Sequence, residues 1–148
     1  MSTGLQDWLN NGWLRPHQPT RKEIADLFAI VDRDRKDAGT AGMSADWRFG
    51  IAYNAALKLC AILLHASGYR PEKTLQHYRT LQALPLILGD RWKTEAAYLE
   101  ACRRKRNVVE YDRVGDASDA DAQELLDFIG DFRATVTDWL KKNHPHLL

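Results

Sequence analysis

The stretch of this sequence with the clearest chemical potential is a run of four basic residues at positions 103–106, late in a charged helical pattern. At helical spacing, Arg106 falls on the same stripe as Leu99 and Cys102, where an apolar side chain is expected. Burying an unpaired guanidinium is very unfavourable, so Arg106 requires a carboxylate, a phosphate or a symmetry-related partner. The alternative is a solvated basic helix end that complements the helix dipole.

Arg103, Arg104 and Asn107 surround Arg106 with further hydrogen-bond donors and are candidate RNA- or nucleotide-binding residues. The formal net charge of the chain is only +1, so its overall charge does not indicate nucleic-acid binding. Any basic surface must be local, and residues 103–106 form the only dense basic cluster in the sequence. Phosphate binding is therefore expected at this run.

Asn54 and Lys58 are the polar exceptions in an otherwise apolar helical segment, and they lie one turn apart on one face. That face is either a partly exposed stripe of the helix or the polar wall of an internal cleft. On the second interpretation, both side chains would help to bind the same RNA or nucleotide.

Several familiar catalytic and cofactor-binding patterns are absent from the sequence. It contains no P-loop, no GxGxxG and no HExxH. The histidines lack metal-ligand spacing; His65 and His77 could meet in space, but two histidines supply only half of a zinc site. Cys60 and Cys102 lie in apolar patterns, which favours buried free thiols in a reducing compartment. We therefore expect neither a metal nor a cofactor.

Length and composition are typical of one soluble globular domain. The chain has 148 residues, of which 45% are hydrophobic and 28% charged, so it can bury a substantial core. Residues 1–10 lack the basic start and apolar run of a secretory signal. The longest apolar stretch, residues 55–66, is interrupted by Lys58 and His65 and is too short to span a bilayer. These features predict a cytoplasmic protein.

Helix start and stop signals divide the chain into an N-terminal arm, residues 1–19, and a helical domain, residues 20–148. In the arm, one helical turn is expected over residues 5–9, and Pro16 and Pro19 keep the following chain extended. No part of the sequence alternates like a strand. Helices are expected to begin at Thr20 with Glu23 as a capping box, at Ser44, at Pro71, at Asp90 and at Ser118.

The short connections between these helices favour an all-α antiparallel bundle of four to five helices. The helix over residues 44–67 is apolar nearly all round, which is typical of a central helix, and Gly68 ends it. The next helix is expected to run from Pro71 to about residue 88, with a kink at Pro85. The basic run belongs to the fourth helix, and an acidic fifth helix follows it.

The segment from Arg106 to Tyr111 resembles the signature of the HEPN superfamily, the small α-helical domains of prokaryotic toxin–antitoxin and defence systems. That signature is an arginine, often followed by a polar residue such as asparagine, with a histidine several residues later. Arg106 matches the arginine and Asn107 the polar residue, whereas Tyr111 stands at the position of the histidine. The order of helices around the motif extends the resemblance to about residues 20–142.

The resemblance implies an up-and-down bundle of four or five helices that forms a two-fold homodimer. In active members, arginines and histidines of both chains face a shared cleft in which RNA is cut without metal. The arginine stabilises the phosphorane-like charge, and the histidine assists attack by the 2′-hydroxyl. Carried over, this implies Arg106 and Tyr111 as catalytic residues of a weak ribonuclease site, because tyrosine, with a pKa of about 10, is a poor base at neutral pH.

Two alternatives remain open. In some relatives a tyrosine two residues after the histidine is a nucleotidylation target; on that register Arg104 is the arginine, Val109 replaces the histidine and Tyr111 is the acceptor. The chain would then be a non-catalytic HEPN subunit that binds a minimal nucleotidyltransferase or a nucleotide. The other alternative is a structural homodimer in which Arg106 pairs with an acidic residue across the interface.

Overall fold

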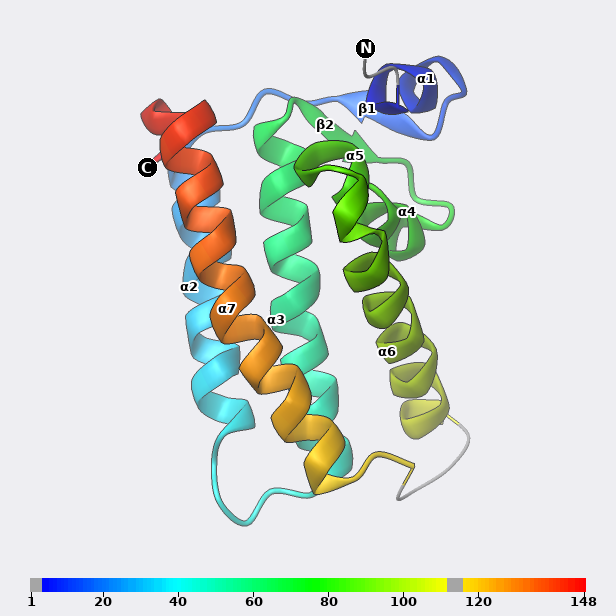
Figure 1. The fold of residues 1–148 in the computed structure, drawn as a ribbon, viewed down its shortest axis with the longest axis vertical. Helices are drawn as coiled ribbons and strands as arrows, with labels where there is room; N and C mark the ends of the chain where they lie inside the picture. Colours follow the sequence, from blue (N-terminus) through cyan, green and yellow to red (C-terminus); the bar gives the residue numbers. More distant parts are fainter. Residues whose placement is uncertain (1–3, 112–115) are drawn as a thin grey trace.

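The structure, a computed structural model, describes residues 4–111 and 116–148, and the side chains of all of these except residues 108–111. Within the described residues, four long helices run up and down beside one another (Figure 1). They are α2 (Arg21–Ala38), α3 (Ala45–Ala66), α6 (Lys93–Tyr111) and α7 (Asp119–Asn143). The all-α bundle predicted from the sequence is confirmed.

The central helix is α3, because apolar residues cover nearly its whole circumference. Helices α2, α6 and α7 all pack against it. The largest of its fully buried side chains are Tyr53, Leu59, Ile62, Leu63 and Leu64. Most of the core is formed between α3 and the apolar faces of its neighbours.

Among the described helices, α3 is also the one that is long and apolar enough, by composition, to cross a membrane. However, 67% of its most apolar window lies buried inside the protein. This burial is what a soluble bundle requires of its core helix.

The starts and stops of the long helices follow local signals in the sequence. Thr20, Ser44 and Ser118 each accept a backbone N–H bond from the first turn of the helix that follows, as predicted. The Asp121 carboxylate in turn accepts a hydrogen bond from the backbone N–H of Ser118, which completes a capping box. Gly68 ends α3 with a φ of 97°, a conformation that favours glycine.

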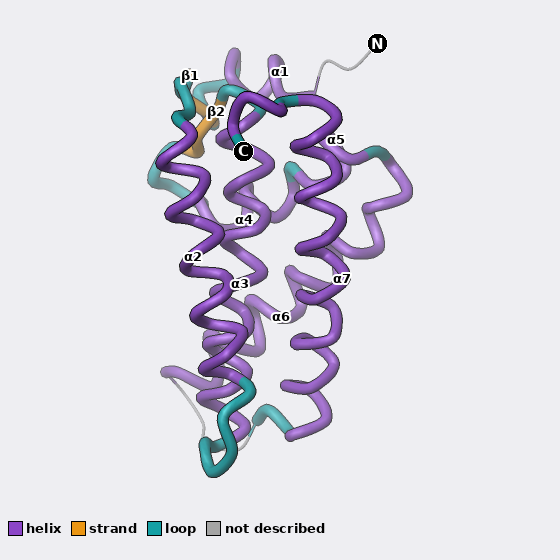
Figure 2. The backbone as a smooth tube through the Cα atoms, turned by 90° about the vertical axis from the view of Figure 1, so that its left-hand side faces the viewer, coloured by secondary structure: helices purple, strands orange, loops and turns teal. Residues whose placement is uncertain are grey.

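The N-terminal arm is fastened to the end of α3. Helix α1 (Gly4–Asn10) leads into β1 (Leu14–Pro16), which pairs antiparallel with β2 (Tyr69–Pro71). Two views of the backbone place this pair at the end of the bundle where α3 finishes (Figures 1 and 2). Residues 14–16 of the arm are extended, as expected, but their pairing as a strand was not predicted. The pair is only three residues long on each side, which is too short to show alternation in the sequence.

The segment between β2 and α6 also departs from the predicted single helix. Pro71 ends β2 instead of opening a helix, and the predicted helix is two short ones, α4 (Gln76–Gln82) and α5 (Leu84–Leu88). The break falls at Ala83 because Pro85 has no N–H for a continuous helical hydrogen bond. Two 3-10 turns among the described residues, η1 (Asp90–Trp92) and η2 (Pro145–Leu147), precede α6 and follow α7.

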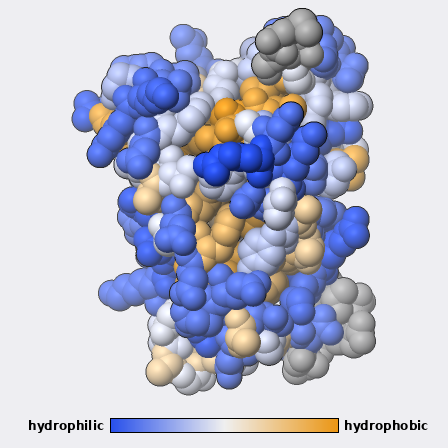
Figure 3. Space-filling view, viewed as in Figure 1, coloured by the Kyte–Doolittle hydropathy of each residue, from blue (hydrophilic) through white to orange (hydrophobic). Residues whose placement is uncertain are grey.

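Aromatic side chains on η1 and α6 contact α7. The rings of Tyr98 on α6 and Phe128 meet edge to face with their centroids 5.4 Å apart, and those of Trp92 on η1 and Phe132 lie 5.8 Å apart. A space-filling view shows apolar side chains gathered between α6 and α7 (Figure 3). Ring contacts therefore help to join α7 to η1 and α6.

Candidate functional site

A polar cleft of about 380 Å³ is lined by side chains from α2, α3, α4 and the β1–β2 pair. Its basic lining residues are Arg15 on β1, Lys58 on α3, Arg70 on β2 and Lys73 beyond it. Among the described residues that line it, Glu23 is the one carboxylate. The cleft therefore carries net positive charge, although Arg15 is partly neutralised by an exposed ion pair with Glu72. This second basic cluster is drawn from segments too far apart in the sequence to be noticed there.

One face of α3 forms a wall of this cleft. Lys58, Ala61 and His65 follow one another at spacings of three and four residues, and all are only half-buried on a helix that is otherwise mostly buried. The interpretation of Lys58 as part of a polar cleft wall thus agrees with the structure. Asn54, one turn earlier, has a structural role instead, because its amide donates a hydrogen bond of 2.7 Å to the buried carboxylate of Asp34 on α2.

His77 on α4 links the cleft to the basic run on α6. Its ring lines the cleft beside Lys58. Burial lowers the pKa of His77, and the positive charges of Arg106, Lys58 and Arg103 lower it further. Positive charges on α3 and α6 therefore both act on this imidazole of α4.

Arg106 is half-buried, as its place on an apolar stripe requires. Its guanidinium lies over the ring of Tyr53, with Cζ 5.6 Å from the ring centroid, in cation–π geometry. Tyr53 itself is 1% exposed, and its hydroxyl has no hydrogen-bond partner among the described residues. Burial raises the pKa of this phenol, so it stays protonated at neutral pH.

The other members of the basic run are engaged in ion pairs within the protein. Arg103 donates two hydrogen bonds, of 2.7 and 2.8 Å, to the carboxylate of Glu100, and Arg104 donates a third. Lys105 contacts Asp121 on α7 at 3.1 Å. Much of the positive charge that the sequence concentrates at this run is thus neutralised by neighbouring carboxylates.

Two further predicted site residues, Asn107 and Tyr111, lie near the end of α6. Asn107 is half-buried in the last turns of α6. The side chain of Tyr111 lies outside the described residues, and so does that of Val109. The structure therefore tests neither the catalytic role of Tyr111 nor the alternative register of the motif.

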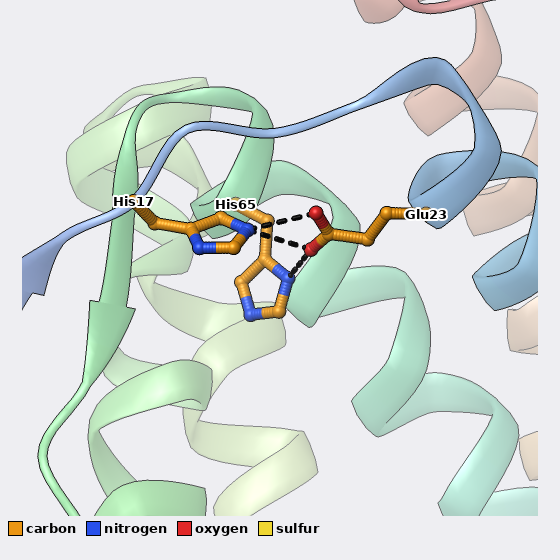
Figure 4. A group of neighbouring side chains, drawn as sticks. All are labelled: His17, Glu23 and His65. Carbon is orange, nitrogen blue, oxygen red and sulfur yellow. Dashed lines mark hydrogen bonds and ion pairs between the residues drawn. The ribbon is translucent and has the colours of Figure 1, made fainter.

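A second constellation in the lining of this cleft is formed by His17, Glu23 and His65, which face one another (Figure 4). Nε2 of His17 lies 2.8 and 2.7 Å from the two carboxylate oxygens of Glu23, and Nδ1 of His65 lies 2.7 Å from one of them. The imidazole centroids are 4.8 Å apart. Three ligand-type side chains from different segments are thus within reach of one small ion.

The protonation of this cluster follows from its contacts. Burial raises the pKa of the Glu23 carboxyl, but the hydrogen bonds and charges of His17 and His65 outweigh burial and hold that pKa below its usual range. Burial lowers the pKa of His65 more than its bond to Glu23 raises it. At neutral pH the cluster therefore contains an ionised carboxylate and an uncharged His65, which are the forms that bind a metal ion.

From the sequence, His65 and His77 could meet in space, and both line the cleft. The contacts of the His65 ring are with Glu23 and His17. The signal that was missed is the spacing of six residues between His17 and Glu23, which flanks the cap at Thr20. Glu23 was assigned to a capping box. The side chain of Thr20 does accept from the Glu23 backbone, but the Glu23 carboxylate is turned to the two histidines.

The two cysteines are buried free thiols, as predicted. Burial raises the pKa of Cys60 to about 12 and that of Cys102 to about 11. Neither thiol is therefore ionised enough at neutral pH to act as a nucleophile.

No protein-family model matches this chain, and neither a curated protein nor a solved structure matches it.

Proposed function

We propose that this chain is a HEPN-type RNA-binding protein that holds RNA phosphates at the basic cleft lined by Lys58 and His77 and at the neighbouring Arg106. The observation that carries this proposal is the positively charged lining of the cleft, to which Lys58 and His77 contribute. The charge of Arg106 on α6 also acts on His77, whose pKa it lowers. Phosphate oxygens accept hydrogen bonds from such groups, and the release of counterions makes the binding salt-dependent.

The electrostatics within the basic run support Arg106 and Lys58 as the leading phosphate contacts. Arg103 and Arg104 already share the carboxylate of Glu100, so binding a phosphate would require them to give up or share those bonds. The charges of Arg106 and Lys58 both lower the pKa of His77, which lines the cleft. The charge of Arg103 lowers the same pKa, so Arg103 is proposed as a further contact.

Single-stranded RNA with a fluorescent label, titrated with protein at several salt concentrations, tests the proposal by anisotropy. Wild type should bind with an affinity that falls steeply with salt. Arg106→Ala and Lys58→Ala should each weaken binding and reduce the slope of log K against log salt by about 0.7, the value for one contact to a single strand.

Arg35→Ala is the matched control, because Arg35 lies on a separate surface beside Asp32, Lys36 and Leu126. It should bind RNA like wild type. Equal binding by wild type and Arg106→Ala at low salt would contradict the proposal. Competition with a mononucleotide distinguishes recognition of a polymer from recognition of a single nucleotide. The mononucleotide should displace the labelled RNA at a concentration similar to that of unlabelled RNA only if the protein recognises a single nucleotide.

RNA cleavage by this protein is expected to be weak. Position 111 corresponds, by the resemblance, to the histidine of active members, and this chain has tyrosine there. Assistance by that histidine to attack by the 2′-hydroxyl is worth about 10²–10⁴-fold in rate. Tyr111→His should raise cleavage in a manner that depends on Arg106. Robust metal-independent cleavage by wild type, unchanged in Tyr111→Phe, would show that the chemistry lies elsewhere.

A further inference from the structure

We propose that His17, Glu23 and His65 form a binding site for a divalent transition-metal ion of the Zn²⁺ class, with an open coordination position that faces the cleft. The ligand atoms of the three side chains all lie within 4.8 Å of one another. Two imidazole nitrogens and one carboxylate oxygen are a donor set that Zn²⁺ accepts in proteins, and three such ligands leave a fourth position for water or substrate. This inference is independent of RNA binding.

The geometry of the cluster requires only a small adjustment to admit the ion. Bonds of about 2.0–2.2 Å in a tetrahedral site place ligand atoms about 3.3–3.6 Å apart. The nitrogen-to-oxygen distances here, 2.7 and 2.8 Å, are those of hydrogen bonds in which the imidazoles donate to Glu23. To bind the ion, each imidazole would carry its proton on its other ring nitrogen, and the bonded nitrogens and oxygens would move apart by about 0.5–0.9 Å.

The three ligands are positioned by separate parts of the fold. Glu23 lies in the first turn of α2, and His65 in the last turn of α3. His17 follows β1, and its backbone N–H donates a bond of 2.8 Å to the carbonyl of Gly68. The site is therefore held before any ion arrives, and the ligand-bearing side chains are all only partly exposed.

The surroundings indicate what would occupy the open position. The ion would bring two positive charges to a cleft that already contains Lys58, Arg70 and Lys73, whereas Glu23 supplies a single negative charge. An anionic oxygen ligand at the fourth position would offset this excess. Phosphate is the anion that matches both the basic side chains and the preference of Zn²⁺ for a fourth oxygen ligand.

Titration of the chelator-treated full chain with Zn²⁺ by calorimetry tests the site. Wild type should bind one ion per chain. His17→Gln and His65→Gln should each weaken the binding by more than about 100-fold, because removal of a ligand exceeds the effect of losing a supporting contact. Binding of equal affinity by wild type and both variants would overturn the proposal, as would a wild type that binds no Zn²⁺ at micromolar concentration.

The C-terminal histidines provide the matched control. The rings of His144 and His146 lie 6.0 Å apart, so this pair is the obvious adventitious site. The double variant His144→Gln/His146→Gln should keep the single ion. Loss of binding in that variant, with none in His65→Gln, would assign the ion to the C-terminal pair.

A spectroscopic measurement on wild type avoids dependence on variants that fold poorly. Co²⁺ in a protein site of low coordination number gives strong visible absorption, whereas the hexaaqua ion absorbs weakly. Wild type loaded with Co²⁺ should show the strong bands, and inorganic phosphate should shift them as it enters the open position. A spectrum like that of hexaaqua Co²⁺ would overturn the proposal.

Discussion

Glu100 neutralises part of the positive charge of residues 103–106 through ion pairs within α6. It is 8% exposed and accepts hydrogen bonds from both Arg103 and Arg104. This pairing could have been predicted, because Glu100 precedes the two arginines by three and four residues on one helix. At the residue scale, Arg106 differs from both in that its guanidinium lies over the ring of Tyr53.

The Glu100 network makes the stability of the protein depend on acid pH. Hydrogen bonds from Arg103 lower the pKa of Glu100 in the folded protein. Its contribution is therefore fully present above about pH 4.5, the ordinary value, and is lost as the pH falls through the folded-state pKa. Glu100→Gln should lower the free energy of unfolding by about 2 kcal/mol at pH 7, and by much less at pH 3.

Denaturant unfolding at the two pH values measures this difference. Glu95→Gln, on the same helix, is the control and should show a smaller and less pH-dependent effect. A Glu100→Gln variant that is destabilised equally at pH 7 and pH 3 would contradict the assignment.

His77 should report on the charges that surround it. Because Arg106 and Lys58 lower its pKa, Arg106→Ala should raise that pKa towards the usual value, and Arg35→Ala should leave it unchanged. A bound phosphate group should raise it as well, by offsetting the positive field. Titration of the imidazole signals by NMR measures all three effects, and an unshifted His77 in Arg106→Ala would show that the two side chains are not coupled.

At the scale of elements, prediction succeeded where the determining signal is local. Side-chain oxygens at Thr20, Ser44 and Ser118 are sufficient to start a helix, and each does so within a residue of the expected position. The β1–β2 pair was missed because its stability depends on a partner elsewhere in the chain. Pro71 was misassigned for a similar reason, since proline suits a strand end and a first helical turn equally well.

Two glycines on and beside α3 should respond to alanine in opposite directions. Gly68→Ala places a side chain at a φ of 97° and should cost about 1–2 kcal/mol of stability, while loosening the bond from His17 to its carbonyl. Gly50→Ala introduces a methyl group into a helix with nothing within 4 Å and should add up to about 1 kcal/mol. Thermal unfolding of both variants measures the difference, and equal shifts would contradict the backbone argument.

At the scale of the whole molecule, the bundle could be predicted but the cleft could not. Helix periodicity and caps report on each element separately, so they gave the fold class. The cleft combines Arg15, Glu23, His65 and Lys73, and their proximity depends on how the arm and the turn after α3 meet. Lys58, which also lines the cleft, could be predicted as a site residue, because a lysine on an apolar helix is anomalous within its own element.

The homodimer that the HEPN resemblance implies makes a prediction at this scale. Trp47 is 68% exposed and lies in the first turn of α3. Helix α3 begins at the end of the bundle where α6 finishes (Figure 1). Exposed tryptophans are frequent anchors of interfaces. Sedimentation velocity at micromolar concentration should give the mass of a dimer for wild type and a weakened dimer for Trp47→Ala.

Trp13→Ala is the control for the dimer, because Trp13 is 37% exposed on the arm at the opposite end of the bundle. It should sediment like wild type. A strictly monomeric wild type would rule out the proposed assembly.

The β1–β2 pair also has a consequence for the order of folding. It joins Leu14 to Pro71 and so encloses α2 and α3 in one closed loop of chain. Helices adjacent in sequence pack early, whereas a long loop closes late because its entropy must first be offset. The arm should therefore dock last and open first in hydrogen exchange. A ligand that bridges His17 to His65 would act as a latch on that final step and slow the exchange of the arm above all.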